Sequence, residues 1–202
     1  METARKPFAQ GHPTPLRIAV LGGGIAGLSA AIALSRVGHK VDVSVLLLQR
    51  NRQDCLPTKI FEQPDSGDQE SYVVADLTPN ITGLLRRWGV RVEDAGAVDV
   101  TKLAVRSSTG EETVIADLST SPEMWQHPWQ QVQSLRLYQT LRDIAIDGIK
   151  PPATLHKSAT LASADPEAGR VLMQNGTAVE ADVIVGADGL HVSGTMSMQS
   201  NV

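Results

Sequence analysis

The chain has 202 residues, 42% of them hydrophobic and 20% charged, which is long enough to bury a core without disulfides or metal ions. The net charge is −4 and the basic residues do not cluster, which argues against a nucleic-acid-binding surface. The longest apolar run, residues 43–48, is far shorter than the roughly 20 residues that span a bilayer, and the polar residues 1–15 indicate a disordered tail rather than a secretion signal. With one cysteine, Cys55, the composition predicts a cytoplasmic protein without a disulfide framework.

The predicted order begins with a strand, a glycine-rich turn and a helix. Residues 16–21 form a short apolar run of the kind found in buried parallel strands. Residues 28–37 carry apolar side chains at helical spacing, and Gly38 ends the pattern. Residues 40–43 start a second strand. This order predicts a β-α-β unit whose helix crosses over between parallel strands.

Two amphipathic helices are expected further along the chain. The first covers residues 79–90 and should bury Ile81, Leu84, Leu85 and Trp88. The second covers residues 135–146 and should bury Leu137, Leu141, Ile144 and Ala145.

Two hairpins and a final strand complete the predicted elements. One hairpin covers residues 103–117 around Thr109-Gly110, and the other covers residues 170–181 around Asn175-Gly176, a strong two-residue turn signal. Residues 153–164 should be extended. Residues 182–186 predict a buried strand that runs into a turn at Asp188-Gly189.

Residues 22–27, Gly-Gly-Gly-Ile-Ala-Gly, fill the pattern G-x-G-x-x-G between the first strand and the first helix. Gly22 allows the tight turn, Gly24 lets a diphosphate approach the backbone, and Gly27 lets helix and strand pack closely. The backbone N–H groups that follow, at Ile25 and Ala26, would bind the diphosphate. The alternative is a glycine-rich turn that binds nothing.

This pattern requires an acidic residue at the end of the second strand, to bind the ribose of the dinucleotide. In an uninterrupted strand that position falls near Val45, which cannot accept a hydrogen bond through its side chain. We therefore interpret residues 44–60 as an insertion, which could be translated intron sequence, and assign the role to Glu62. Arg50, binding a 2′-phosphate, is a weaker alternative.

Several segments together resemble the FAD-dependent aromatic-ring monooxygenases similar to salicylate hydroxylase. They are residues 16–43, 61–63, 79–80, 84–90 and 181–191. The resemblance adds Gln63, beside Glu62, to the cofactor-binding residues. It also implies that Asp188 and Gly189 lie near the FAD diphosphate, at the carboxyl edge of the sheet where ligands bind.

The resemblance implies an α/β fold with a Rossmann-type FAD-binding domain over residues 16–191. Residues 91–133 would be a partial antiparallel, substrate-side portion. In this family NAD(P)H reduces FAD, and the reduced flavin activates oxygen to hydroxylate a small, usually aromatic molecule. Because the flavin does the chemistry, we assign no catalytic side chain. The alternatives are a non-catalytic, truncated FAD-binding fragment and an NAD(P)-only Rossmann dehydrogenase.

The chain also departs from the family. Ser134 and Arg136 stand where the family carries an arginine and then an acidic residue that contact the cofactor. Residues 192–202 form an uncharged tail that does not follow the family pattern. The expectation is therefore an enzyme truncated after its Asp-Gly motif, with poor activity or none.

Three other features were weighed as possible sites. The five histidines lack metal-binding spacing, so no metal site is expected. Cys55 has no evident base and receives no nucleophilic role. The aromatic cluster at residues 124–129 has two interpretations: a wall of a flavin or substrate cavity, or, as we favoured, a loop packed on the domain.

Overall fold

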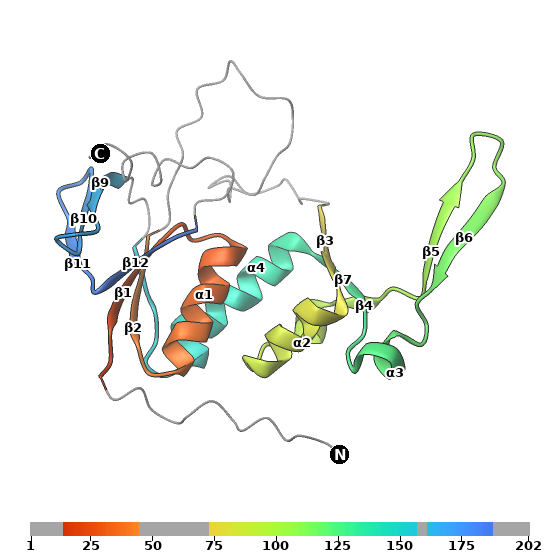
Figure 1. Ribbon diagram of the computed structural model, residues 1–202, viewed down its shortest axis with the longest axis horizontal. Coiled ribbons are helices and arrows are strands. Elements are labelled where there is room, and N and C mark those ends of the chain that lie inside the picture. The colour runs from red at the N-terminus through yellow and green to blue at the C-terminus, as the bar shows by residue number, and fades with distance from the viewer. Residues whose placement is uncertain (1–13, 45–72, 157–160, 188–202) are drawn as a thin grey trace. The chain divides into compact units, whose positions relative to one another are not determined.

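The computed structural model describes residues 14–44, 73–156 and 161–187 (Figure 1). The chain divides into two compact units. One contains residues 1–64 and 141–202, and the other contains residues 65–140. The domain boundaries expected from the sequence stay a prediction.

The first unit contains a four-stranded parallel sheet with the order β12-β1-β2-β8. Its strands are β1 (Arg17–Leu21), β2 (Lys40–Ser44), β8 (Thr154–His156) and β12 (Val183–Gly186). Helix α1 (Ile25–Arg36) connects β1 to β2. The predicted α/β fold and its β-α-β opening are therefore confirmed. Ser44 belongs to β2, so an insertion there starts no earlier than residue 45; residues 45–60 lie outside the described residues.

The side chains of β1 alternate between the two faces of this sheet, and those of residues 18–21 are buried on both faces. Ile18 and Val20 point to the face that α1 covers, where Leu28 and Ile32 of the helix are also fully buried. The π-helical turn η2 (Ile144–Gly148) contacts the same helix. The helix thus packs directly behind the turn that joins it to β1.

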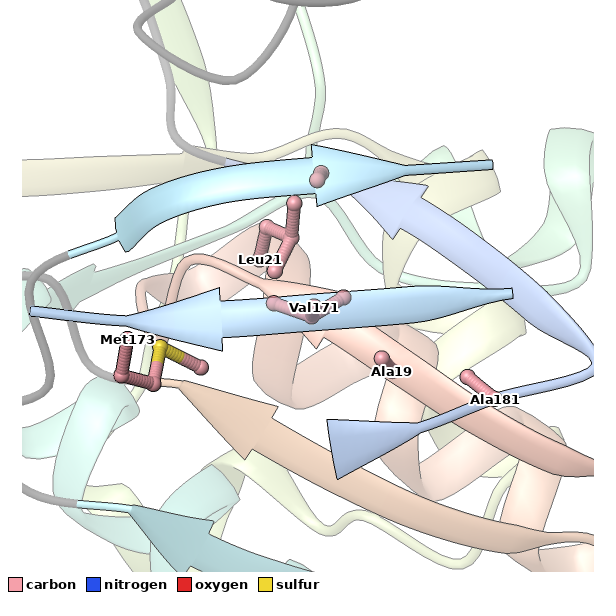
Figure 2. Packing of buried hydrophobic residues seen from close by; sticks show 6 residues of the cluster. Ala19, Leu21, Val171, Met173 and Ala181 are labelled. Atoms are coloured by element: carbon pink, nitrogen blue, oxygen red, sulfur yellow. The ribbon is translucent and has the colours of Figure 1, made fainter. Parts of the chain in front are cut away.

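A three-stranded antiparallel sheet covers the other face. It consists of β9 (Leu161–Asp165), β10 (Arg170–Met173) and β11 (Ala178–Glu180), in the order β11-β10-β9. Ala19 and Leu21 of β1 form a buried cluster with Val171 and Met173 of β10 (Figure 2). The predicted hairpin at Asn175-Gly176 is confirmed as the β10–β11 turn.

One expectation for the parallel sheet was wrong in detail. The final strand, β12, was expected to be buried, but Val183 is 40% exposed. Among the described strands β12 lies at the edge of the sheet, with β1 as its neighbour on one side. An apolar run of this length does not reveal from its sequence whether its strand is central or lies at an edge.

The second unit has a small antiparallel sheet in the order β3-β7-β4 and a separate hairpin, β5–β6. The strands are β3 (Val74–Leu77), β4 (Val98–Asp99), β5 (Lys102–Arg106), β6 (Glu112–Asp117) and β7 (Gln130–Gln133). The helices are α2 (Pro79–Arg87), the 3-10 turn η1 (Val92–Ala95), α3 (Ser121–Trp125) and the start of α4 (Ser134–Asp143). The hairpin expected at Thr109-Gly110 is confirmed.

Helix α2 exists where it was predicted, but only part of its expected apolar face is buried. Leu85 is buried as expected, whereas Ile81 and Leu84 are 37% and 42% exposed and Thr82 is completely buried. The Thr82 hydroxyl donates to the carbonyl of Pro128 at 2.8 Å, so a polar residue shares the inward face with Leu85.

The second predicted helix is confirmed as α4 followed by η2. Leu137, Leu141 and Ala145 are buried as expected, while Ile144 is partly exposed. The change from α- to π-helical turns at residue 144 accounts for this difference, because it shifts the angular position of the last residues around the helix.

Candidate dinucleotide-binding site

The glycine-rich turn lies between the carboxyl end of β1 and the start of α1. Gly22 is buried and has φ +117°, a conformation that side chains rarely adopt. A Cβ added to Gly27 would lie 1.8 Å from the carbonyl oxygen of Gly22. Both positions therefore require glycine for the fold itself, since the turn and the first helical turn touch through their backbones.

Gly24 is different, because nothing in the fold requires it to be glycine. It is the N-cap residue of α1, with extended backbone (φ −75°, ψ −172°), and it is exposed. A Cβ placed there would meet no atom of the described residues within 4 Å. Within this part of the chain the space in front of Gly24 is open, as an approaching diphosphate group requires.

The N-terminus of α1 has the electrostatic properties of an anion site. No side chain caps it, and its first turn contains no acidic residue. The first N–H groups of a helix, here those of Ile25 and Ala26, have no acceptor within the helix, and the helix dipole is positive at this end. The residues present therefore fit a diphosphate.

The carboxyl ends of three parallel strands meet beside this turn. Leu21 lies in register with Ser44 of β2 and with Gly186 of β12. The N–H of Ala187 donates to the carbonyl of Leu21 at 2.7 Å, which brings the chain leaving β12 next to the glycine-rich turn. Asp188 follows directly in the sequence.

Four of the predicted cofactor-binding residues, Glu62, Gln63, Asp188 and Gly189, lie outside the described residues, as does the alternative Arg50. The described part of the site therefore consists of Gly22, Gly24, Ile25, Ala26 and Gly27.

The structure reveals a side-chain hydrogen bond that the sequence analysis missed. Asp42 of β2 and His156 of β8 lie 3.0 Å apart (Oδ1 to Nε2), and both side chains are half-buried. The pair joins the two strands on the face that the antiparallel sheet covers. The available signal was Asp42 itself, a carboxylate between two buried valines.

An open pocket lies within the second unit. Its volume is about 410 Å³, and it is lined by Pro79, Asn80, Trp125, His127 and Trp129. The loop of the aromatic cluster also packs on this unit, because Trp129 Nε1 donates to Asp76 Oδ1 at 3.0 Å. Both interpretations of the cluster therefore stay open.

The family departures at residues 134 and 136 also lie in this unit. The N–H of Ser134 donates to the carbonyl of Val73 at 2.9 Å, and Ser134 is buried. A Cβ on Gly96 would lie 3.1 Å from a guanidinium nitrogen of Arg136, which places this arginine over the turn after η1.

The described residues contain no group of three or more His, Cys, Asp or Glu side chains that could hold a metal ion. They also contain no helix long and apolar enough to cross a membrane.

Comparison with known proteins gives matches over most of the chain. The family model for pyridine nucleotide-disulphide oxidoreductases matches residues 16–119. Hispidin-3-hydroxylase of Neonothopanus nambi is 31% identical over 179 residues, which cover 87% of this chain and 38% of that protein. An FAD-dependent monooxygenase of Aspergillus candidus is 27% identical, over 87% of this chain and 37% of that protein.

A solved structure supports the fold. The p-nitrophenol 4-monooxygenase of Pseudomonas putida superposes with a TM-score of 0.67 and 19% identity, over 95% of this chain and 44% of that one. The predicted resemblance to flavin-dependent monooxygenases is confirmed by these relatives, and so is the Rossmann-type fold. The chain spans less than two fifths of the length of the two sequence relatives.

Proposed function

Since the chain belongs to the pyridine nucleotide-disulphide oxidoreductase family, we propose that it binds FAD and is the FAD-binding part of a flavin-dependent monooxygenase. The observation that carries this proposal is the pairing of open space at Gly24 with the uncapped N-terminus of α1. The FAD diphosphate would lie against Gly24 and accept hydrogen bonds from the N–H groups of Ile25 and Ala26. Gly22 and Gly27 hold this turn in shape.

The remaining cofactor contacts are also part of the proposal. Glu62 would accept a hydrogen bond from the adenosine ribose, with Gln63 beside it. Asp42 is an acidic residue of β2, and its bond to His156 supports assigning the ribose to Glu62 instead. Asp188 and Gly189 would lie at the diphosphate, since Ala187 is bonded to the end of β1.

The proposed reaction is that of the monooxygenase relatives, in which bound FAD would supply electron transfer from NAD(P)H and activation of oxygen. A small aromatic substrate and a cytoplasmic location complete this proposal.

The competing functions predict different ligands. An NAD(P)-only dehydrogenase would use the same glycine-rich turn for a nicotinamide dinucleotide. A non-catalytic fragment would bind FAD without turning over. The resemblance at Asp188-Gly189 favours FAD over a nicotinamide cofactor alone.

Calorimetric titration of the purified chain with FAD and, separately, with NADP⁺ and NAD⁺ tests the proposal. We expect FAD to bind most tightly. Loss of a hydrogen bond to a charged group costs about 1.5–3 kcal/mol, so Glu62→Ala should weaken FAD binding by about tenfold or more. Tighter binding of a nicotinamide dinucleotide, with no retention of FAD, would contradict the proposal.

Activity separates the monooxygenase from the fragment. NAD(P)H oxidation by the FAD-loaded chain would be followed with a panel of phenolic acids, and peroxide and hydroxylated product would be measured together. Water must be excluded from the space around the flavin if the activated oxygen is to be transferred to the substrate rather than released as peroxide. For the 202 residues alone we expect mostly peroxide; one product formed per NAD(P)H would show a complete active site.

A further inference from the structure

The turn between β10 and β11 contains the one Asn-Gly sequence of the 202 residues, Asn175-Gly176. Two backbone hydrogen bonds close this turn. The Gly176 N–H donates to the carbonyl of Met173 at 3.0 Å, and the Met173 N–H donates to the carbonyl of Thr177 at 2.8 Å. Asn175 and Gly176 are both exposed. The turn therefore holds an asparagine side chain in water, directly before a residue that has no side chain.

The carboxamide of an asparagine is open to attack by the backbone nitrogen of the next residue. Here Gly176 N is the nucleophile and Asn175 Cγ is the carbon attacked, and the covalent chain between them keeps the two atoms close. A Cβ on the following residue hinders this approach, and glycine has none. The sequence Asn175-Gly176 therefore lacks the main steric obstacle to ring closure.

A hydrogen bond orients the asparagine side chain for this reaction. The Thr177 N–H donates to Asn175 Oδ1 at 3.0 Å. When the carboxamide carbon is attacked, negative charge develops on its oxygen, and a backbone N–H at this distance stabilises that charge. Thr177 thus assists the attack on Asn175 Cγ.

A hydrogen bond of the turn opposes the reaction. Because the Gly176 N–H donates to Met173, this bond must open before the nitrogen can reach Asn175 Cγ. It lies in a turn where residues 174–178 are all exposed, and local opening of such a turn costs little free energy. The turn therefore delays ring closure without preventing it.

Asn80 has the opposite environment within the same chain. It is also exposed, but it lies in α2, where the Ile81 N–H donates to the carbonyl of Thr78 at 2.9 Å. Ile81 is branched at Cβ and crowds the approach to the Asn80 side chain. Asn80 should therefore be stable under conditions in which Asn175 reacts.

We propose that Asn175 is a site of deamidation through a succinimide that it forms with Gly176. A bond forms between Gly176 N and Asn175 Cγ, and the carboxamide nitrogen leaves as ammonia with the proton from the Gly176 N–H. Water then opens the ring. Cleavage of the bond from Gly176 N to Cγ gives aspartate, whereas cleavage of the bond from Gly176 N to the main-chain carbonyl carbon of residue 175 gives isoaspartate. Water is the one co-reactant.

The isoaspartate product should loosen the hairpin. It adds a CH₂ group to the main chain of the turn, so the hydrogen bonds between Met173 and the residues after the turn lose their geometry. Met173 is buried in the cluster with Ala19 and Leu21 of β1, so the change extends to the packing between the two sheets. This modification involves neither the glycine-rich turn nor FAD, so it goes beyond the proposed function and is tested apart from it.

Peptide mapping by mass spectrometry tests the reaction. The folded chain would be incubated in mildly alkaline buffer, with released ammonia measured alongside. We expect Asn175 to convert to a mixture of aspartate and isoaspartate several-fold faster than Asn80 reacts. Conversion of Asn175 no faster than that of Asn80, or conversion in the urea-unfolded chain alone, would overturn the proposal.

A variant identifies the source of the ammonia. Asn175→Gln is the control, because its longer side chain closes a larger ring far more slowly, and it should release much less ammonia than the parent. The change is made at residue 175 because Gly176 has φ +85°, which other residues rarely adopt. Equal release from the variant and the parent, with circular dichroism showing both folded, would overturn the proposal.

Thermal melting tests the effect on the hairpin. The isoaspartyl form would be separated from the parent by ion exchange, and we expect it to melt at a lower temperature. Asn175→Asp is the matched control: it has the new charge on a normal backbone, and its carboxylate can still accept from the Thr177 N–H, so it should melt close to the parent. Equal melting temperatures for the isoaspartyl form and the parent would overturn the proposed effect on packing.

Discussion

The three glycines of the G-x-G-x-x-G pattern, Gly22, Gly24 and Gly27, differ in the reason for which each position is a glycine. Gly22 adopts a left-handed conformation, and Gly27 lies against the Gly22 carbonyl, so both serve the fold. Gly24 has ordinary backbone angles, and a Cβ there would meet no atom of the described residues within 4 Å, so the fold itself does not require glycine at this position. We propose that the approach of the diphosphate requires it.

Gly27→Ala should destabilise the chain whether or not FAD is present. The new methyl group would lie 1.8 Å from a backbone oxygen, which cannot rotate away as a side chain does. Overpacking of this kind costs about 1–3 kcal/mol of unfolding free energy. Urea denaturation without cofactor measures it; a midpoint equal to that of the parent would contradict the close approach.

The surface ion pair between Arg17 and Asp182 should make the free energy of unfolding depend on pH in the acid range. The Arg17 guanidinium donates hydrogen bonds to Asp182, which joins β1 to the start of β12, and lowers the pKa of that carboxyl below 3.8, its ordinary value. A carboxyl whose pKa is lowered by folding stabilises the folded state above its ordinary pKa and loses this contribution as the pH falls through the lowered value. Arg17→Gln should therefore be less stable than the parent at neutral pH.

The difference should disappear in acid. Thermal melting of both proteins between neutral pH and about pH 2 checks this, and the gap in melting temperature should close at the acid end. Because both side chains are largely exposed, we expect a small gap that salt reduces. A gap that stays constant over the whole range would mean that Arg17 acts without Asp182.

Among the elements, β10 decides how the two sheets of the first unit pack. Val171 and Met173 point into the cluster with Leu21 of β1, whereas Leu172 between them is 38% exposed (Figure 2). The alternation of a strand thus separates a core face from an outer face within three residues.

Met173→Ala should lower the free energy of unfolding by about 2–5 kcal/mol, because it leaves a cavity between the sheets. Leu172→Ala is the matched control and should cost much less, since its side chain already meets solvent. Chemical denaturation of the two variants measures both values. Equal losses would contradict the packing of β10 on the parallel sheet.

The helices and hairpins show which structural features the sequence predicts correctly and which it does not. Periodicity located α1, α2, α4 and both hairpins, because each of these elements is determined by local spacing and turn residues. For α2 it placed Leu85 correctly on the buried face but not Ile81 and Leu84, which are exposed, while Thr82 is buried and donates to the carbonyl of Pro128. A contact between residues 46 positions apart leaves no local signal.

For the whole molecule, the sequence predicted the α/β class and the place of the glycine-rich turn, because one short motif contains both. It did not predict the bond between Asp42 and His156, nor that Trp125 and Trp129 would line one pocket with Asn80. These groups come together only when distant segments fold.

The central claim, that Gly24 is the contact point of the FAD diphosphate, is tested most directly by FAD titration of the parent and of Gly24→Val. The substitution should leave the unfolding midpoint unchanged, because a Cβ there meets nothing within 4 Å. It should abolish FAD binding, because the side chain would occupy the space that the diphosphate needs. Equal FAD affinity in the two proteins, with the same stability, would contradict the account.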